Sequence, residues 1–277
     1  MNNKITFKTI LGEIILTLCS ILIMMPVYYF VIGAFKKRID IVKHPLTITR
    51  SEFITKNFSY VFKKMHFADA LKNTALITII SLVLIILLAS LAGFAIARIK
   101  IRLFDGIYII MLALMVIPFI GCVLPLVTQS VKLGLYNKVW GCILIQVAWN
   151  LPFAIFLYTG FMGDLPASLE EAAYIDGCCT WGVYSRVFFP LLAPVTATCC
   201  IRCGTGIWND YIVSNSLLNS NRTPTLMVGV NTFFGQYTTE YGYAFAAILM
   251  ASAPMIILFI CLQKYFIKGI AAGAVKG

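Results

Sequence analysis

Four acidic side chains lie within thirteen positions of a chain that is otherwise basic. They are Asp164, Glu170, Glu171 and Asp176, out of eleven Asp and Glu residues against twenty-two Lys and Arg. No histidine accompanies them, and no paired carboxylates with the spacing of a catalytic centre are apparent. Exposed carboxylates of this kind can instead contact a partner, and we expect this segment to dock on another protein.

The nine cysteines are the other residues with possible metal or redox chemistry. Cys199, Cys200 and Cys203 have a spacing that resembles a ligand cluster, but no histidine or carboxylate lies near them. Most of the cysteines fall inside apolar stretches, where cysteine behaves as a small hydrophobic residue. We therefore favour helix packing over a redox site, and we expect no metal.

The chain also carries no recognisable catalytic or nucleotide-binding motif. Its two histidines, His44 and His66, are isolated in one polar stretch, and the phosphate-binding pattern G-x-x-x-x-G-K-[ST] is absent. We expect a protein that is not an enzyme, binds no cofactor itself and does not hydrolyse ATP.

A short helix is predicted to position the acidic residues. Ser168 followed by Glu171 has the spacing of a capping box, and Pro166 would stop a preceding helix. Gly177 can end the helix in the left-handed conformation, and Thr180 can cap a second short helix. One helix face would carry Leu169, Ala172, Ala173 and Asp176. This pattern favours docking in a groove of a partner over an amphipathic connector lying on the membrane.

The surrounding sequence is that of an all-α, multi-pass membrane protein. Hydrophobic residues make up 60% of the 277 positions and charged residues 12%, and the mean hydropathy is +0.90. Six stretches are long enough to span a bilayer as transmembrane helices: 10–35, 71–97, 106–127, 139–162, 187–208 and 244–266. The first is longer than the apolar core of a cleavable signal, so we expect it to be retained.

The basic residues flank the apolar stretches, which favours contact with anionic lipids over nucleic acid. Six spans place both termini on one side of the membrane. If that side is cytoplasmic, it carries nine Lys and Arg against twelve outside, and the stretch 36–70 with the adjoining Lys72 decides the imbalance. The charge distribution therefore leaves the orientation open.

The acidic segment resembles the E-A-A loop of permease subunits of binding-protein-dependent ABC importers. The matching pattern is the triplet 171–173, three residues, Gly177, nine residues, Val187, two residues and Pro190. The resemblance implies a cytoplasmic coupling helix, and hence cytoplasmic termini, in a type I importer core. The ATPase-coupling residues that it implies are Glu170, Glu171, Ala172, Ala173, Asp176, Gly177 and Pro190.

Further motifs are similar to sugar permeases, and the ending is similar to the maltose-type second permease. They lie at 57–60, 70–74, 92–98, 118–126, 134–135, 151–153, 160–161, 208–211 and 269–277. The resemblance implies a sugar or oligosaccharide importer in a prokaryotic plasma membrane. It also implies a second, different permease, an external solute-binding protein, and two ATPase subunits that use ATP and Mg.

Three parts of the chain are expected on this basis. Residues 1–70 would form the first transmembrane helix and an exterior loop, 71–267 the transmembrane core, and 268–277 a cytoplasmic tail reaching toward the ATPase dimer. With the loop at 212–243, the stretch 36–70 would form the outer mouth.

Polar and aromatic residues within the spans are candidates for the substrate pathway. They are Gln146, Trp149, Asn150, Arg202, Trp208, Asn209 and Asp210. Hydrogen bonds between helices are the alternative role for the polar ones. Arg202 departs from the apolar residue usual in the family, and it either faces the pathway or a partner subunit or extends to one membrane face.

Two other functions remain open at the level of sequence. The first is a permease of the same superfamily for an amino acid or peptide. The second is a channel or carrier that works without ATP.

Overall fold

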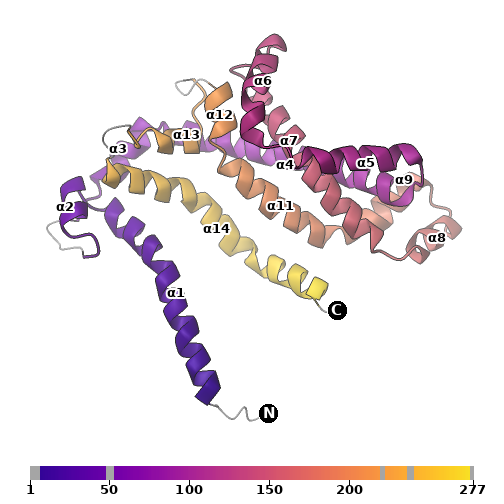
Figure 1. Ribbon diagram of the computed structural model, residues 1–277, viewed down its shortest axis with the longest axis horizontal. Coiled ribbons are helices and arrows are strands. Elements are labelled where there is room, and N and C mark those ends of the chain that lie inside the picture. Colours follow the sequence, from indigo (N-terminus) through magenta and orange to yellow (C-terminus); the bar gives the residue numbers. More distant parts are fainter. Residues whose placement is uncertain (1–6, 48–52, 219–221, 236–239, 275–277) are drawn as a thin grey trace. The chain divides into compact units, whose positions relative to one another are not determined.

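The computed structural model describes residues 7–47, 53–218, 222–235 and 240–274, which form helices and their connections (Figure 1). The chain divides into two compact units. Unit 1 comprises Met1–Phe67 and Gly229–Pro254, and unit 2 comprises Ala68–Val228 and Met255–Gly277. Three helices, α4 (Phe67–Arg98), α13 (Leu226–Asn231) and α14 (Tyr241–Ala274), begin in one unit and end in the other, although only the first residue of α4 lies in unit 1.

Unit 1 contains α1 (Phe7–Ala34), α2 (Arg38–Lys43) and α3 (Lys56–Lys64). Its polar contacts gather where α1 ends. The ammonium group of the buried Lys36 donates to the carbonyl oxygens of His44 and Thr47. The amide of Asn57 in α3 donates to the carbonyl oxygens of Ala34 and Lys36, both at 2.8 Å. The bond to Ala34 satisfies a carbonyl that the last turn of α1 leaves without a helical partner.

Unit 2 holds the larger hydrophobic core. Its long helices are α4 (Phe67–Arg98), α7 (Val139–Gly163) and α11 (Ala193–Trp208), with α5 (Arg102–Leu114), α6 (Phe119–Lys132) and α12 (Ile212–Leu217) around them. Ile85, Tyr158 and Phe188 are fully buried in the core. The acidic segment forms α8 (Ser168–Ile175), which lies at one end of unit 2, at the right of Figure 1.

Four helices are long and apolar enough to cross a membrane: Ile10–Ala34, Phe67–Arg98, Val139–Gly163 and Tyr241–Ile260. They correspond to four of the predicted spans. The other two predicted spans, 106–127 and 187–208, are each bent helix pairs. Counting each bent pair as one span gives up to six in the part of the chain that the structure describes.

Proline explains the sharper of the two bends. The axes of α5 and α6 differ by 107°, and Pro118 stands between them with an extended backbone, φ −70° and ψ 126°. Proline has no amide hydrogen and disfavours the helical conformation in the residue before it. The amides of Met115, Val116 and Ile117 accordingly close tight turns on the carbonyls three residues back. The second pair, Thr180–Leu191 and Ala193–Trp208, bends by 69°.

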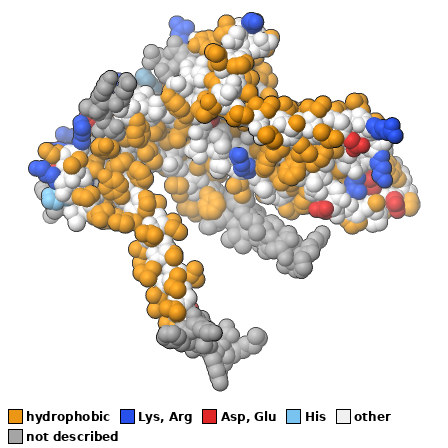
Figure 2. Space-filling model, in the orientation of Figure 1, with side chains coloured by type: hydrophobic (Ala, Val, Ile, Leu, Met, Phe, Trp, Pro, Cys, Tyr) orange, Lys and Arg blue, Asp and Glu red, His pale blue; other side chains and the backbone are white. Residues whose placement is uncertain are grey.

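The surface combines apolar flanks with charged ends (Figure 2). Figure 2 shows hydrophobic side chains over the exposed flank of α1 and over α5, whereas Lys, Arg, Asp and Glu gather at the end of unit 2 that carries α8. Val116 is 83% exposed and Ile120 75%. Large apolar side chains with this exposure are typical of a surface covered by lipid or another subunit.

Candidate functional site

Helix α8 presents the acidic segment, but its start differs from the predicted one. Ser168 is the first helical residue and Ala167 occupies the capping position, without a side-chain hydrogen bond. The amides of Glu170 and Glu171 both donate to the carbonyl oxygen of Ala167. The predicted capping box was therefore wrong, because the turn begins at Pro166, whose fixed φ suits a first helical turn. Thr180 likewise begins the short helix α9 (Thr180–Gly182) and does not cap it.

The end of α8 agrees with the prediction. Gly177 has a φ of +80°, its amide donates to the carbonyl oxygen of Tyr174 at 3.0 Å, and the amide of Cys178 donates to that of Ala173 at 2.9 Å. This pair of bonds is the Schellman motif, which needs a left-handed residue at the position of Gly177. A Cβ atom added there would meet no atom within 4 Å. Glycine is required here by the backbone conformation, and space for a side chain is available.

Most of α8 faces away from the core. Ala173 is 5% exposed and anchors the helix, whereas Ile175 is 86% exposed and Tyr174 44%. Of the predicted face, only Ala173 is buried. The acidic residues Glu171 and Asp176 are exposed, as are Ala172 and Pro190, and Glu170 is half-buried. We call the exposed residues Glu171, Ala172, Tyr174, Ile175 and Asp176 the α8 face. It combines carboxylates with large apolar side chains.

The chain returns to the core through an unusual helical turn. After α9 it forms a π-helical turn, η1 (Val183–Phe188), and then α10 (Phe189–Leu191), whose first turn contains Pro190. Val183, Tyr184 and Phe188 in η1 are buried. A π-helical turn shifts the register of side chains on a helix and is frequent at functional sites. The segment after α8 is therefore fixed firmly while α8 itself projects.

A second candidate site is a cleft of about 340 Å³ beside the break between α5 and α6. Trp149, Asn150 and Phe153 of α7 and Arg202 of α11 contribute its polar and aromatic lining. The guanidinium carbon of Arg202 lies 5.6 Å from the ring centroid of Phe153. The ring centroid of Trp149 lies 4.6 Å from that of Phe119 in an edge-to-face arrangement. Hydrogen-bond donors beside aromatic surface can hold a small polar ligand.

The cleft collects three of the residues predicted for a substrate pathway: Trp149, Asn150 and Arg202. The other predicted residues are not among its described lining. Gln146 and Trp208 are buried, and Asn209 is exposed at the end of α11. Sequence reasoning missed Phe153, although its place directly after Pro152 in an apolar span was a usable signal.

Asp210 has a clear structural role. Its carboxylate accepts hydrogen bonds from the amides of Val213 and Ser214, at 3.1 and 2.9 Å, and from the hydroxyl of Ser214 at 2.9 Å. These bonds satisfy amides in the first turn of α12. The charge of Asp210 is thus engaged within the chain.

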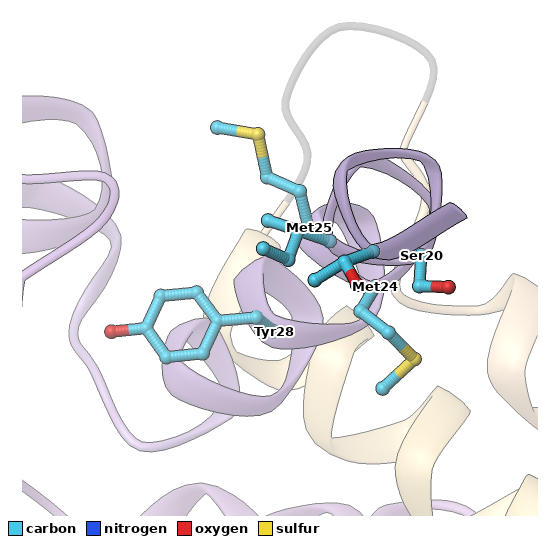
Figure 3. A pocket seen from close by; sticks show the side chains of 6 residues that line it. Ser20, Met24, Met25 and Tyr28 are labelled. Carbon is cyan, nitrogen blue, oxygen red and sulfur yellow. The ribbon is translucent and has the colours of Figure 1, made fainter. Parts of the chain in front are cut away.

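A further hollow lies on α1, in unit 1. It measures about 390 Å³ and is lined by Thr17, Ser20, Ile21, Met24, Met25 and Tyr28. Figure 3 shows that the labelled side chains project from one helix in different directions. Because a single helix supplies all of the described lining, the hollow does not enclose a ligand.

Comparisons with known proteins agree with these features. The melibiose/raffinose/stachyose import permease protein MelC of Bacillus subtilis is 38% identical over 80% of each chain. The probable starch degradation products transport system permease protein AmyC of Thermoanaerobacterium thermosulfurigenes is 30% identical over 93% of each chain. Both alignments extend over most of each protein, so the similarity is not confined to one motif.

The fold is also found in a solved structure. A chain of a bacterial ABC transporter involved in the import of the acidic polysaccharide alginate superposes with a TM-score of 0.78 at 20% identity, over 93% of this chain and 95% of the other. The family model for the binding-protein-dependent transport system inner membrane component matches residues 85–272, which include the cleft and α8. The chain is therefore a multi-pass membrane protein that belongs to the family of inner membrane components of binding-protein-dependent transport systems.

Proposed function

We propose that this chain is the permease subunit of an ATP-driven importer for a sugar or oligosaccharide. The observation that carries the proposal is the α8 face, held at the end of unit 2 by the buried Ala173 and ended by Gly177. A helix that leaves Ile175 and Tyr174 exposed beside carboxylates is suited to fill a groove on a partner. The partner that fits is an ATPase subunit, which supplies the energy that this chain has no motif to provide.

The α8 face is cytoplasmic in this proposal, because ATP is. The end of unit 2 that carries α8 also carries Arg98, Lys100 and Arg102. This agrees with the excess of basic residues on the cytoplasmic side of membrane proteins. With six spans, both termini are cytoplasmic. The stretch 268–277 then reaches toward the ATPase dimer; α14 continues to Ala274, and residues 275–277 lie outside the described part.

The external surface receives a solute-binding protein. The stretches 36–70 and 212–243 form it, although residues 48–52, 219–221 and 236–239 within them lie outside the described part. A second, different permease completes the pore. Two ATPase subunits close on ATP, move α8 and switch the pathway between its inward-facing and outward-facing states, which requires different contacts in each state.

The sugar class rests on the relatives. MelC is named for import of melibiose, raffinose and stachyose, and AmyC for transport of starch degradation products. A test is uptake of labelled sugars into proteoliposomes that contain both permeases, the ATPase and the binding protein. Sugar uptake should require ATP inside the vesicles. Uptake that persists with an inactivated ATPase would refute the proposal, and uptake of amino acids alone would refute the sugar class.

The cleft beside α7 provides substrate contacts in the same proposal. Arg202 supplies hydrogen-bond donors, Asn150 an amide, and Trp149 an aromatic surface against which the apolar face of a sugar ring can pack. A charged residue within a span costs about 2.5–3.5 kcal/mol on insertion scales. A charged residue is normally kept within a span, despite this cost, where its charge faces a polar pathway.

Arg202→Met is expected to weaken sugar transport by about tenfold, because hydrogen bonds from a charged donor contribute about 1.5–3 kcal/mol. Its insertion into the membrane should not suffer, since the variant removes a charge from a span. The measurement is the KM for uptake in proteoliposomes. Ile201→Met, at the neighbouring exposed position outside the described lining of the cleft, is the matched control. An unchanged KM in Arg202→Met would remove Arg202 from the pathway.

A further inference from the structure

We propose that Arg98 is a positioning residue that locks both ends of the coupling loop to α4, so that movement of α8 is passed directly to α4. We define the coupling loop as residues 164–188, from the residue after α7 to the end of η1. The inference rests on the proposed function, because it assigns the route by which the ATPase would act on the membrane helices.

The first contact is with the start of the coupling loop. Arg98 is the last residue of α4, and its Nη2 atom donates to the carbonyl oxygens of Met162 and Leu165, the latter at 2.7 Å. Met162 lies in the last turn of α7, and Leu165 lies two residues beyond it, in the coupling loop. The positive guanidinium also complements the negative end of the α7 dipole. One side chain of α4 thus caps α7 at the point where the coupling loop begins.

The second contact is with the end of the coupling loop. The guanidinium carbon of Arg98 lies 4.8 Å from the ring centroid of Phe188, the last residue of η1. Phe188 is fully buried, and its ring packs edge-to-face on Phe94 of α4 at 5.3 Å. A guanidinium over an aromatic face is an attractive arrangement that a flat, delocalised cation makes best. The same side chain therefore touches both ends of the loop.

Further contacts between α4 and the end of the coupling loop lie on the same face of α4. The hydroxyl groups of Ser90 and Tyr184 are 2.8 Å apart in a buried hydrogen bond, and the ring of Tyr184 lies 5.5 Å from that of Phe94. Ser90, Phe94 and Arg98 follow one another at intervals of four, which places them on one face of the helix. This face contacts η1 through Tyr184 and Phe188.

These contacts hold the start and the end of the coupling loop, and α8 projects between them. If the segments on either side of α8 could hinge freely, a movement of α8 would change only those segments and would not reach α4. Here Leu165 on one side and Tyr184 and Phe188 on the other are tied to the last turns of α4. A contiguous set of packed and hydrogen-bonded groups can carry coupling between two sites, and mutation of its members tests whether it does.

The test compares Arg98→Gln, Arg98→Lys and Tyr184→Phe in the complete transporter, with Arg102→Gln as the control. Arg102 is exposed at the start of α5, close to Arg98 in sequence, and no hydrogen bond, ion pair or ring contact joins it to the coupling loop within the described residues. Tyr184→Phe removes one hydroxyl and keeps the ring packing. Two quantities are measured: hydrogen exchange of the α8 amides in the assembled complex, and sugar molecules transported per ATP hydrolysed.

We expect Arg98→Gln to raise α8 amide exchange and to lower the ratio of transport to hydrolysis, each by about tenfold, as loss of hydrogen bonds from a charged donor would produce. The ATPase subunits should still co-purify. Arg98→Lys should fall between, because an ammonium donates but does not stack. Tyr184→Phe should lower the ratio about threefold, in line with one buried hydrogen bond, and Arg102→Gln should match the wild type.

Wild-type exchange and a wild-type ratio in Arg98→Gln would overturn the inference. If Arg98→Gln does not accumulate in the membrane, Tyr184→Phe serves as the test. An unchanged ratio of transport to ATP hydrolysis in Tyr184→Phe would overturn the inference. A faster-exchanging α8 with an unchanged ratio would also overturn it, because the contact would then be structural only. Failure of the proposed function is distinguishable, because the wild-type complex would then transport no sugar. The comparison of α8 amide exchange between wild type and variants would still show whether Arg98 holds the coupling loop.

Discussion

Glu171→Lys is expected to abolish sugar uptake, by about a hundredfold or more, while the protein remains in the membrane. Glu171 is exposed on α8, and its amide donates to the carbonyl oxygen of Ala167. Reversing its charge at a helix N-terminus costs the helix only about 0.3–1 kcal/mol. Placing a like charge in a docked interface costs about 2–5 kcal/mol, so the loss should fall on partner binding. Asp164→Asn, exposed but before α8, is the control.

The measurements are membrane content, ATPase co-purification and uptake in proteoliposomes. Gly177 provides an independent variant of the same prediction. Gly177→Ala imposes only the strain of a left-handed backbone, about 1 kcal/mol, whereas Gly177→Asp adds a charge in space that is open within the chain. Transport should be reduced modestly by alanine and abolished by aspartate. Normal uptake in Glu171→Lys and Gly177→Asp would refute docking through α8.

The positions of the long helices followed from composition, but their directions did not. A run of apolar residues predicts that a segment lies in the membrane, and 106–127 satisfied that criterion. Whether Pro118 kinks a helix or ends one depends on whether neighbouring groups re-satisfy the freed carbonyls. In this chain it ends α5, and α6 leaves at 107°. That outcome depends on packing in three dimensions and cannot be obtained from local pattern.

The two ends of α8 also differ in how well the local sequence predicted them. Gly177 was predicted correctly because a positive φ is a local requirement that few residues meet. Ser168 was assigned as the cap because its spacing to Glu171 is the usual one. Pro166, two residues earlier, begins the turn instead, and its carbonyl accepts the amide of Leu169. Two local signals competed there, and sequence alone offers no energy with which to choose between them.

Contacts between distant segments lay wholly outside the reach of sequence patterns. Arg98 and Phe188 are 90 positions apart in the sequence, yet the guanidinium packs on the ring. The pairing of Arg202 with Phe153 is similar. Periodicity predicts which face of a helix is buried, but it does not predict which neighbouring helix packs against that face. The residues of the coupling loop were therefore found from the sequence, whereas its attachments to α4 were not.

Gly93→Leu is expected to prevent stable folding of unit 2, and Gly93→Ala to destabilise it measurably. A Cβ atom at Gly93 would lie 2.8 Å from the Cβ of Tyr158 and 3.1 Å from the amide nitrogen of Thr159. Neither atom can swing aside, because one is backbone and the other is attached to it. Overpacking of this kind costs about 1–3 kcal/mol even for small additions. The whole of α4 would have to move away from α7.

The matched control is Gly160→Ala, which adds the same methyl group to α7 where no atom lies within 4 Å. Alanine is favoured over glycine inside a helix by about 1 kcal/mol, so this variant should keep or raise the melting temperature in detergent while Gly93→Ala lowers it. Equal melting temperatures would contradict a close approach of α4 and α7.

The consequence of that approach extends beyond the pair of helices. Tyr158 is fully buried, and its hydroxyl is hydrogen-bonded to that of Thr196 in α11 at 2.9 Å. Forcing Tyr158 away from Gly93 therefore strains the contact between α7 and α11 as well. Since α7 and α11 supply Trp149, Asn150 and Arg202 to the cleft, Gly93→Ala should also raise the KM for sugar, and Gly160→Ala should leave it unchanged. One glycine without any ligand contact would then set both the stability of unit 2 and the geometry of its cleft.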